Sequence, residues 1–454
     1  MNSTKDFNVA IVGGGIVGLI CAIGLARAGV QVDVFESASK YGDTGAGVGI
    51  GPNAVRVLKD MGIMDEVRAR SEDSAPPTRP WTFIMGQEPH NLVYEYPNTS
   101  DEQGIAVHRA AFVNALVSIL PDGVHSHLRK RCVAVRAASD GSERACLHFA
   151  DGSAHVADVV IGADGIKSVV RTEIFGSEDE RLVDTGACAY RGQVPTKDLL
   201  EAGIPEETLQ SALLWMGADK HLVTYPIMDG KLLNVAACPF DYAHSMIPAG
   251  SQASWPAWVA KVQPAEMLDI FSDFGRNART ILEHIKEPTR WSIHGLYPPL
   301  ESYVGAAQAK EEEKRLDGGV NVALIGDAAH AMLPFLGAGA GAGIEDAYVI
   351  ASLLAHPQTS RKNLSYVLRA YNSVRVPRAT YIANGSRRAG EVMHGRGPSG
   401  PSASGRRDDL ESQWEKVWNY GIKEDVERAV AALEEGGVFD QLEMFAVPVQ
   451  GSLL

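Results

Sequence analysis

The sequence predicts an α/β protein, and three glycine-rich segments that lie far apart in the chain carry that prediction. These segments span residues 13–18, 162–168 and 326–343, and each follows an apolar run of strand length. A helix-like run follows the first segment, and the chain after residue 344 is mostly helical in pattern. Apolar strands that alternate with helices are typical of a parallel sheet with helices packed on its faces.

The first segment has the spacing of a dinucleotide-binding turn. Gly13, Gly15 and Gly18 form a G-x-G-x-x-G pattern between an apolar run and a helix-like run. Such a turn presents backbone N–H groups and the positive end of a helix dipole to a pyrophosphate. The next predicted strand ends at Glu36, eighteen residues after Gly18. Because a carboxylate at this place accepts hydrogen bonds from an adenosine ribose, we predict that Glu36 binds the ribose.

The second segment is less specific when taken alone. An apolar run leads into Asp164-Gly165 and then into a helix whose first turn carries Ser168. By itself this pattern indicates a β-turn with a capping serine.

In the third segment a predicted strand ends at Asp327, a glycine-rich loop follows, and a helix begins near Ile344. Such a loop lets a planar ligand approach the backbone, and the dipole of the helix stabilises an anion near its first turn. The alternative is a flexible surface loop. The buried strand before the loop and its lack of polar residues oppose that interpretation.

Length, charge and cysteine usage exclude several classes of protein. The 454 residues suggest two or three domains, and a net charge of −14 argues against a nucleic-acid partner. Residues 9–30 are apolar enough to suggest a signal peptide or membrane anchor, but the glycine turn explains them better. The five cysteines include no C-x-x-C pair and predict buried thiols in a reducing compartment. We therefore expect a cytoplasmic protein that has no membrane partner.

Other stretches predict individual elements. A helix is expected from Pro52 to Met61 and another over residues 110–120. Residues 132–160 alternate apolar and polar side chains, which predicts hairpins, and residues 181–300 look mostly β. The histidine pair at 125 and 127 has no acidic or cysteine neighbour in sequence, so a surface loop is predicted there and no metal site is expected.

Taken together, in this order and spacing, the three segments resemble those of the flavin-dependent aromatic hydroxylases, the group A flavoprotein monooxygenases. The resemblance extends from Val9 to about Ala383. It is greatest to the salicylate-hydroxylase-like branch and its relatives that hydroxylate phenolic polyketides, and residues 189–195, 221–226 and 331–334 carry it.

The resemblance implies a Rossmann-like FAD-binding domain interleaved with a β-sheet substrate domain, followed by a helical C-terminal region. The predicted boundaries assign residues 1–78, 104–180 and 296–355 to the FAD-binding domain, residues 79–103 and 181–295 to the substrate domain, and residues 356–454 to the helical region.

The resemblance also implies non-covalent FAD, with NADPH or NADH as co-substrate. By position in the family's motifs, the implied cofactor contacts are Gly13, Gly15, Gly18, Glu36, Gly49, Arg109, Asp164, Asp327 and Ala340. Asp164 is implied to touch both FAD and the nicotinamide cofactor, and Asp327 to bind the ribityl chain. The chain departs from the commonest pattern at Phe335-Leu336 and at Ala342, where many relatives carry glutamine. The identity of the substrate is therefore left open.

The implied reaction is hydroxylation of a phenolic substrate, either salicylate-like or a phenolic polyketide. NAD(P)H reduces FAD, O₂ forms a flavin C4a-hydroperoxide, and the distal oxygen attacks an electron-rich ring carbon. Loss of the phenol proton makes the ring more nucleophilic. A cation or base beside the hydroxyl is therefore expected to matter most among the catalytic side chains.

Arg191 is the predicted cation, because a guanidinium holds a phenolate or carboxylate through two N–H groups. Without the resemblance, an ordinary surface arginine in a strand is the simpler interpretation. His221 and Tyr225 share a strand face and form the second candidate pair for catalysis, although a lone histidine on such a face is more often a core residue. His330, close to Asp327, is predicted to be structural.

Other function classes share part of the pattern. An NAD-dependent dehydrogenase explains the first segment but neither of the others. A flavin-dependent halogenase shares the FAD motifs, but its W-x-W-x-I-P stretch is absent from this sequence. The intact third glycine-rich segment, residues 326–343, which we call the flavin loop, opposes a non-catalytic flavin-binding protein. An epoxidase or a dearomatising hydroxylase is the alternative within the FAD enzymes, and the expected oligomeric state is a monomer or a homodimer.

Overall fold

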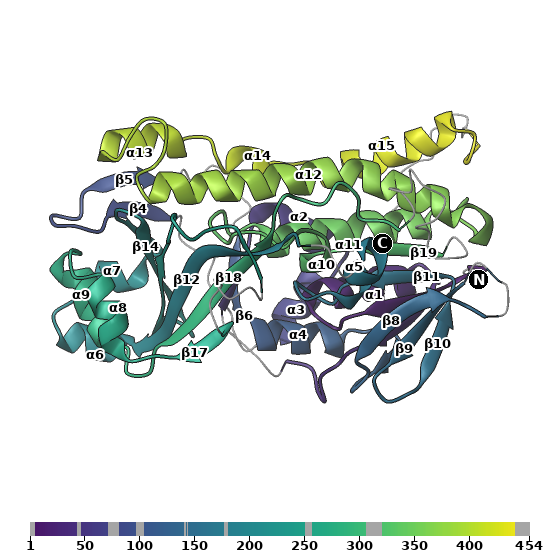
Figure 1. Cartoon of the computed structure of the whole chain (residues 1–454), viewed down its shortest axis with the longest axis horizontal. Coiled ribbons are helices and arrows are strands. Elements are labelled where there is room, and N and C mark those ends of the chain that lie inside the picture. Colours follow the sequence, from purple (N-terminus) through teal and green to yellow (C-terminus); the bar gives the residue numbers. More distant parts are fainter. Residues whose placement is uncertain are drawn as a thin grey trace.

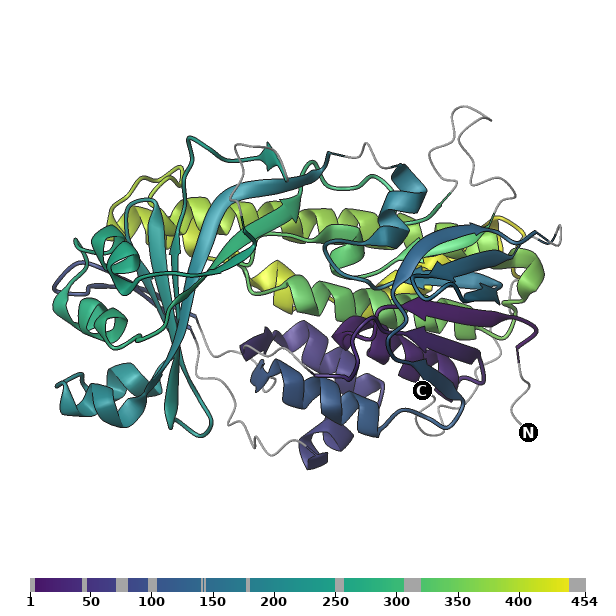
Figure 2. The ribbon, with the colours of Figure 1, turned by 60° about the horizontal axis from the view of Figure 1, so that its bottom comes forward.

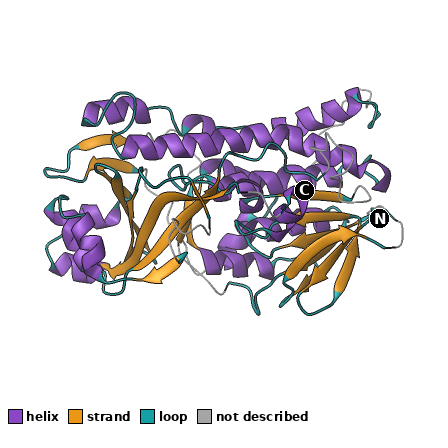
Figure 3. Ribbon diagram, viewed as in Figure 1, coloured by secondary structure: helices purple, strands orange, loops and turns teal. Residues whose placement is uncertain are grey.

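A parallel sheet and a larger mixed sheet lie at opposite ends of the molecule, and one long helix runs along both (Figures 1 and 2). The computed structural model describes residues 5–42, 47–70, 81–96, 104–139, 142, 144–176, 180–249, 257–305 and 320–440. Figure 3 shows the C-terminal helices lying across one side of both sheets. The predicted α/β class and the helical C-terminal region are therefore confirmed.

The parallel sheet has five strands in the order β19-β11-β1-β2-β7. These strands are β1 (Asn8–Val12), β2 (Gln31–Phe35), β7 (Val124–His127), β11 (Val159–Gly162) and β19 (Asn321–Leu324). Strands β1, β11 and β19 are neighbours, and each is followed by one of the three glycine-rich segments. Because parallel strands end at the same edge of a sheet, the fold brings the three segments together there.

Helices and a small antiparallel sheet complete this part of the molecule. Helix α1 (Ile16–Arg27) packs against α11 (Gly339–Ala355). The remaining elements are α2 (Pro52–Asp60), α3 (Met64–Arg70), α4 (Arg109–Ser118), α5 (Val169–Phe175), α10 (Asp327–His330), the β3–β6 pair (Gly47–Ile50 and Ile105–His108) and the antiparallel sheet β8 (Cys132–Ala137), β9 (Ala145–Phe149) and β10 (Ala154–Ala157). The predicted helices at 52–61 and 110–120 and the hairpins at 132–160 are confirmed.

The mixed sheet has nine strands among the described residues, and β16 pairs with β12 off the main order β17-β18-β12-β15-β14-β13-β4-β5. Its strands are β4 (Thr82–Met85), β5 (Leu92–Glu95), β12 (Leu182–Pro195), β13 (Leu213–Met216), β14 (Lys220–Ile227), β15 (Leu232–Pro239), β16 (Ile247–Pro248), β17 (Val259–Lys261) and β18 (Thr289–Leu296). Strands β4 and β5 lie about a hundred residues before the rest in sequence. The chain therefore leaves the parallel sheet, visits the mixed sheet and returns.

The expectation of a mostly β stretch at 181–300 is incomplete. Four helices lie in it: α6 (Thr196–Glu201), α7 (Glu206–Gln210), α8 (Pro264–Ile270) and α9 (Arg276–Glu283). Phe271 and Ile281 from this group pack on one face of the sheet with Trp215 and Val235. These helices are short, so their periodicity is hard to distinguish from that of loops in the sequence.

The end of the third glycine-rich segment differs from the prediction. Helix α11 begins at Gly339, not near Ile344, and the short helix α10 precedes it. A Cβ atom on Gly343 would lie 2.6 Å from Val17 Cγ2. Gly343 is therefore needed inside the helix, where it lets α11 approach α1 closely.

The predicted surface loop around the histidine pair is wrong. His125 and His127 belong to strand β7, and His127 Nε2 lies 2.8 Å from Asp33 Oδ1. Asp33 is buried on the neighbouring strand β2. The acidic partner is distant in sequence and was therefore missed.

The C-terminal helices are α12 (Leu364–Met393), α13 (Ala403–Leu410), α14 (Glu415–Trp418) and α15 (Ile422–Glu435). A buried ion network joins α12 and α15 to α11. Arg375 on α12 is fully enclosed and contacts Asp346 Oδ1 at 2.8 Å, Glu345 Oε2 at 2.9 Å and Asp425 Oδ2 at 3.0 Å. Arg378 also binds Glu345, at 2.9 Å. We call these five residues the Arg375 network. A buried charge of this kind is stable only while its partners remain in place.

Replacement of Arg375 by alanine should leave three buried carboxylates without their shared cation. We expect Arg375→Ala to destabilise the protein by about 3–5 kcal/mol, which thermal and urea unfolding would measure. Arg369→Ala on the exposed side of the same helix is the matched control and should change stability by less than about 0.5 kcal/mol. Equal melting temperatures for the two variants would contradict this role for the network.

Candidate active site

The first glycine-rich turn requires glycine for two steric reasons. Gly13 has φ +110°, and a Cβ atom there would lie 2.3 Å from the carbonyl oxygen of Ala163. At Gly18 a Cβ atom would lie 2.1 Å from the carbonyl oxygen of Gly13. Gly15, by contrast, is the N-cap of α1, and no described residue other than its chain neighbours has an atom within 4 Å of its Cβ position. Within the described part of the chain, this side of the α1 N-terminus is therefore uncovered.

The crevice above the parallel sheet fits a dinucleotide. Helices α1 and α11 both begin without a side-chain cap and without an acidic residue in the first turn, so their N-terminal N–H groups are left for an anion. Ala340 lies in that first turn of α11. Two uncapped helix ends at one sheet edge are what an anionic cofactor such as FAD needs.

Glu36 lies where an adenosine ribose is expected. Its Oε2 accepts a hydrogen bond from the backbone N–H of Gly14 at 2.8 Å, and its Oε1 accepts one from Ala38 at 2.7 Å. These bonds hold the carboxylate against the glycine turn. Each oxygen keeps further acceptor capacity toward the crevice.

Asp164 holds the turn between β11 and α5. Its carboxylate accepts hydrogen bonds from the Ser168 hydroxyl and from the backbone N–H groups of Val169 (2.8 Å) and Val170 (3.2 Å). Burial raises the pKa of Asp164, and these hydrogen bonds oppose the rise. The residue thus orders the start of α5, while Ser168 caps that helix as the turn pattern predicted.

Three further predicted cofactor residues, Gly49, Arg109 and Asp327, come from distant parts of the chain. Gly49 lies on β3, whose partner β6 leads into Arg109 at the start of α4. Arg109 is close enough to Asp327 for its charge to lower the pKa of that carboxyl. Protein atoms surround the Asp327 carboxyl, and the resulting desolvation raises its pKa more than His330 and Arg109 lower it.

His330 is structural, as predicted. Its Nε2 lies 2.5 Å from Asp346 Oδ2, which also accepts a hydrogen bond from the Gly326 N–H at 2.9 Å. Burial lowers the pKa of His330, but the Asp346 carboxylate outweighs burial and the pKa is raised. The pair ties the flavin loop to the Arg375 network.

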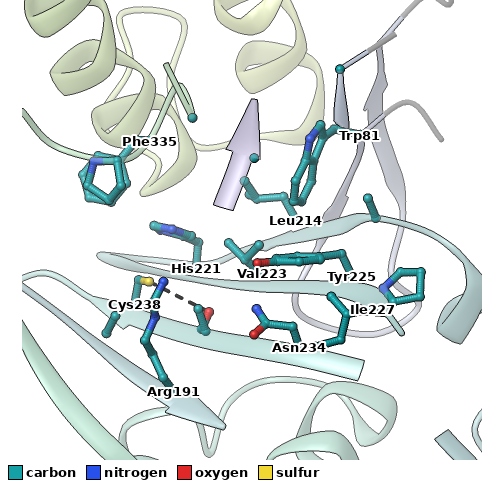
Figure 4. Close-up of a pocket in the computed structure, with 18 of the residues that line it drawn as sticks. Trp81, Arg191, Leu214, His221, Val223, Tyr225, Ile227, Asn234, Cys238 and Phe335 are labelled. Atoms are coloured by element: carbon teal, nitrogen blue, oxygen red, sulfur yellow. Dashed lines mark hydrogen bonds between the residues drawn. The ribbon is translucent and has the colours of Figure 1, made fainter. Parts of the chain in front are cut away.

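A cavity of about 1150 Å³ lies between the mixed sheet and the crevice (Figure 4). Gly49, Ile166 and Gly337 line the part nearest the glycine-rich segments. Much of the remaining wall is apolar, and its large side chains include Trp81, Phe83, Leu214, Phe335, Trp414 and Trp418. The cavity thus combines a mainly apolar chamber with the crevice that fits the cofactor.

The strand register brings the three predicted catalytic residues to one face of the sheet. Val223 on β14 pairs with Ala236 on β15, which pairs with Arg191 on β12. His221 and Tyr225 lie two residues to either side of Val223, so all three candidates face the cavity that they line (Figure 4).

Arg191 lines the cavity, and none of the described residues is its counterion. Among the described residues it makes no hydrogen bond or ion pair, and its guanidinium lies 5.7 Å from the centre of the Trp291 ring. Burial raises the pKa of Tyr225, and the Arg191 charge opposes that rise. Burial likewise raises the pKa of Cys238 to about 12, again opposed by Arg191. Arg191 is therefore a cation that faces a mostly apolar chamber.

The tip of Tyr225 reaches the cofactor side. A Cβ atom on Gly47 would lie 2.5 Å from the Tyr225 hydroxyl, so this hydroxyl touches strand β3. His221 is buried, its Nδ1 lies 2.8 Å from His394 Nε2, and burial lowers its pKa to about 3. His221 is therefore neutral at ordinary pH.

Sequence reasoning missed other polar and aromatic residues of the site. Asn234 pairs with Tyr225 across β14 and β15, lines the cavity, and makes no side-chain hydrogen bond with the described residues. Asn234 is a polar residue in the mostly apolar strand at residues 232–239, and this position could have indicated a role in the site. Trp414 and His394 come from the C-terminal region, and no pattern in the sequence indicated that they belong to the site. Of the residues that mark the departure from the family pattern, Phe335 and Leu336 line the cavity.

Comparisons with known proteins identify the class. The FAD binding domain family matches residues 6–183 and 290–386. A salicylate hydroxylase from Pseudomonas putida is 36% identical over 96% of this chain and 98% of its own length. A 6-methylsalicylate 1-monooxygenase from Aspergillus terreus is 32% identical over 92% of this chain and 89% of its own length.

Solved structures agree with these relatives. A salicylate hydroxylase substrate complex is 33% identical, with a TM-score of 0.79 over 94% of this chain and 98% of that chain. CtdE in complex with FAD, at 20% identity and a TM-score of 0.70 over 96% of this chain and 99% of that chain, shares the fold. The protein is thus a flavin-dependent oxidoreductase, and the chain belongs to the family of FAD-dependent aromatic hydroxylases.

No described helix is both long and apolar enough to cross a membrane. No group of three or more histidine, cysteine, aspartate or glutamate side chains within the described part of the chain could hold a metal ion.

The cofactor assignment predicts weaker FAD binding after removal of either carboxylate. We expect Glu36→Ala and Asp327→Ala each to weaken FAD binding about 10- to 100-fold, the scale of a hydrogen bond to a charged group. Absorbance of bound flavin after dialysis measures the change, and exposed Glu301→Ala is the control. Full flavin occupancy in both variants would contradict the assignment, and acid precipitation should release all the FAD because we expect no covalent bond.

Proposed function

We propose that this enzyme hydroxylates a salicylate-like phenol or a phenolic polyketide, with NADPH or NADH and O₂ as co-substrates. The observation that carries the proposal is the unpaired Arg191 guanidinium in a mainly apolar cavity beside the cofactor crevice. The salicylate hydroxylase and 6-methylsalicylate 1-monooxygenase relatives support this substrate class. An anionic aromatic ring suits such a cavity in both shape and charge.

Arg191 is proposed to hold the phenolate or the neighbouring carboxylate of the substrate. Two parallel N–H groups of the guanidinium match the two oxygens of a carboxylate. The surrounding apolar wall lowers the local dielectric constant, so the attraction is stronger than in water. The phenolate form is thereby favoured, and the ring becomes more reactive toward an electrophilic oxygen.

Tyr225 and Asn234 are proposed to orient the ring. Their side chains lie in one cross-strand pair, next to the pair that leads to Arg191. The Tyr225 hydroxyl touches β3 and so stands at the junction of the substrate chamber and the cofactor crevice. Trp81, Leu214 and Phe335 line the same cavity and would exclude water from the reacting ring (Figure 4).

FAD, when bound, takes electrons from NAD(P)H and supplies the activated oxygen. The residues proposed to hold it are Gly13, Gly15, Gly18, Glu36, Gly49, Arg109, Asp327 and Ala340, with Asp164 acting through the start of α5. We further propose the domain boundaries stated above, a cytoplasmic location and a monomeric or homodimeric state.

Removal of the Arg191 charge tests the proposed mechanism. Arg191→Ala should retain FAD but lose about 2–4 kcal/mol of transition-state stabilisation, measured as kcat/KM for hydroxylation. Arg191→Lys should recover only part of the rate, because an ammonium lacks the planar two-point geometry. Tyr225→Phe should cost less than Arg191→Ala.

The assay is a panel of salicylates, resorcinol aldehydes and hydroxybenzoates, scored by NAD(P)H consumption and product mass. The amount of product formed per NAD(P)H separates lost chemistry from lost folding. Wild-type turnover and coupling in Arg191→Ala would return Arg191 to an ordinary strand position.

A further inference from the structure

A chain of three hydrogen-bonded side chains leads out of the substrate cavity. His221 lines the cavity and its Nδ1 lies 2.8 Å from His394 Nε2. The other ring nitrogen of His394, Nδ1, lies 2.8 Å from the Tyr242 hydroxyl. These residues come from β14, from the end of α12 and from the loop after β15. The fold therefore joins three proton-carrying groups from separate elements in one line.

The inner end of the chain is open to the cavity. His221 Nε2 makes no hydrogen bond with the described residues and is not among the fully enclosed polar atoms of that part of the chain. A substrate hydroxyl in the cavity would supply the hydrogen-bond donor that His221 Nε2 lacks among the described residues. Both nitrogens of His394, by contrast, are already engaged within the chain.

The middle of the chain is sealed from water. His394 is 2% exposed, and the rings of Phe240 and Phe335 each lie 5.6 Å from its own. Phe335 also contacts His221 edge to face, with ring centres 5.2 Å apart. Because aromatic rings and its own burial enclose the His394 imidazole, a proton on that ring leaves along the hydrogen bonds to His221 or Tyr242.

The outer end of the chain reaches the surface. Tyr242 is half-buried, and the exposed guanidinium of Arg396 lies 4.0 Å from the centre of its ring. Arg396 in turn pairs with the exposed Asp219 at 2.5 Å. The remaining charged groups that act on Tyr242 or His394 are Glu391, Arg387 and Arg406.

Both histidines are neutral, which is the form that relays protons. Burial lowers the pKa of His221 to about 3, and burial together with His221, Arg406 and Arg396 holds the pKa of His394 well below its usual value. A neutral imidazole accepts a proton at one nitrogen while it donates from the other.

We propose that His221, His394 and Tyr242 form a proton path that carries the phenolic proton of the substrate from the cavity to the surface. The proposal rests on the proposed function, because it requires a phenol beside His221. His221 Nε2 accepts the proton as the substrate O–H bond breaks. His221 Nδ1 passes a proton to His394 Nε2, His394 Nδ1 passes one to the Tyr242 oxygen, and the Tyr242 O–H gives its proton to water. His394 and Tyr242 are positioning residues, since neither touches the substrate.

Two variants of the FAD-loaded full chain interrupt the path without emptying the cavity. Tyr242→Phe removes one hydroxyl, and His394→Gln keeps hydrogen-bonding groups but cannot relay a proton. With salicylate as the probe, an indicator dye in stopped flow measures proton release on binding, and steady-state kinetics give kcat, KM and their pH dependence. We expect the rate constant of proton release and kcat to fall about 10- to 100-fold near neutral pH, while KM and the flavin absorbance stay unchanged.

The pH profile separates a relay from a structural role. The loss should shrink as pH rises, because hydroxide then removes the proton directly. Tyr94→Phe, a half-buried tyrosine outside the path that packs on Phe83, is the control and should behave as wild type.

Wild-type proton release and kcat in both path variants would overturn the relay, and so would a loss that is equal at every pH. Failure of the proposed function appears elsewhere, in the wild-type enzyme itself: no phenol of the panel would stimulate NAD(P)H oxidation. That result would also overturn the relay, because the path would have no proton to carry.

Discussion

The buried charge of Arg375 is the interaction on which the arrangement of the site depends. Its guanidinium joins α12 to Glu345 and Asp346 on α11 and to Asp425 on α15. These two carboxylates extend the network. Glu345 also binds Asn53 on α2, and Asp346 also binds the Gly326 N–H and His330. One network of ions therefore fixes the flavin loop, the first turn of α11 and the helices that close the cavity.

Close backbone approach is the second requirement, and it follows from the first. The network holds α11 against α1, and Gly343 and Val17 meet there with no room for a Cβ atom. Both helix N-termini then point to the edge where β1, β11 and β19 end. The mixed sheet contributes Arg191 from the other side, and the aromatic walls make its charge effective by excluding water. The chemistry thus depends on the parallel sheet with its helices and the mixed sheet meeting at one cavity.

Much of the fold and of the cofactor crevice could be predicted from the sequence. Glycines at 13, 15 and 18, the strand before them and Glu36 after them form a local pattern whose cause is local, namely steric clearance at a turn and a helix end. Short amphipathic helices such as α6–α9 could not be predicted with the same force, because a helix of six or seven residues shows barely two turns of periodicity. The start of α11 was misplaced because glycine normally disfavours a helix, and tertiary packing outweighed that preference.

The sequence by itself determined the α/β class, the dinucleotide turn and a strand on which His221 and Tyr225 share a face, because these features follow from spacing within a few residues. Only the tertiary structure decided that Arg191 lies in register with Val223 across β15, that the Asp164 carboxylate accepts hydrogen bonds from the first turn of α5, and that His394 lies within hydrogen-bond distance of His221. The physical reason is that strand register and helix packing set these distances. Both arise from burial of apolar faces between segments far apart in the chain, which no local pattern encodes.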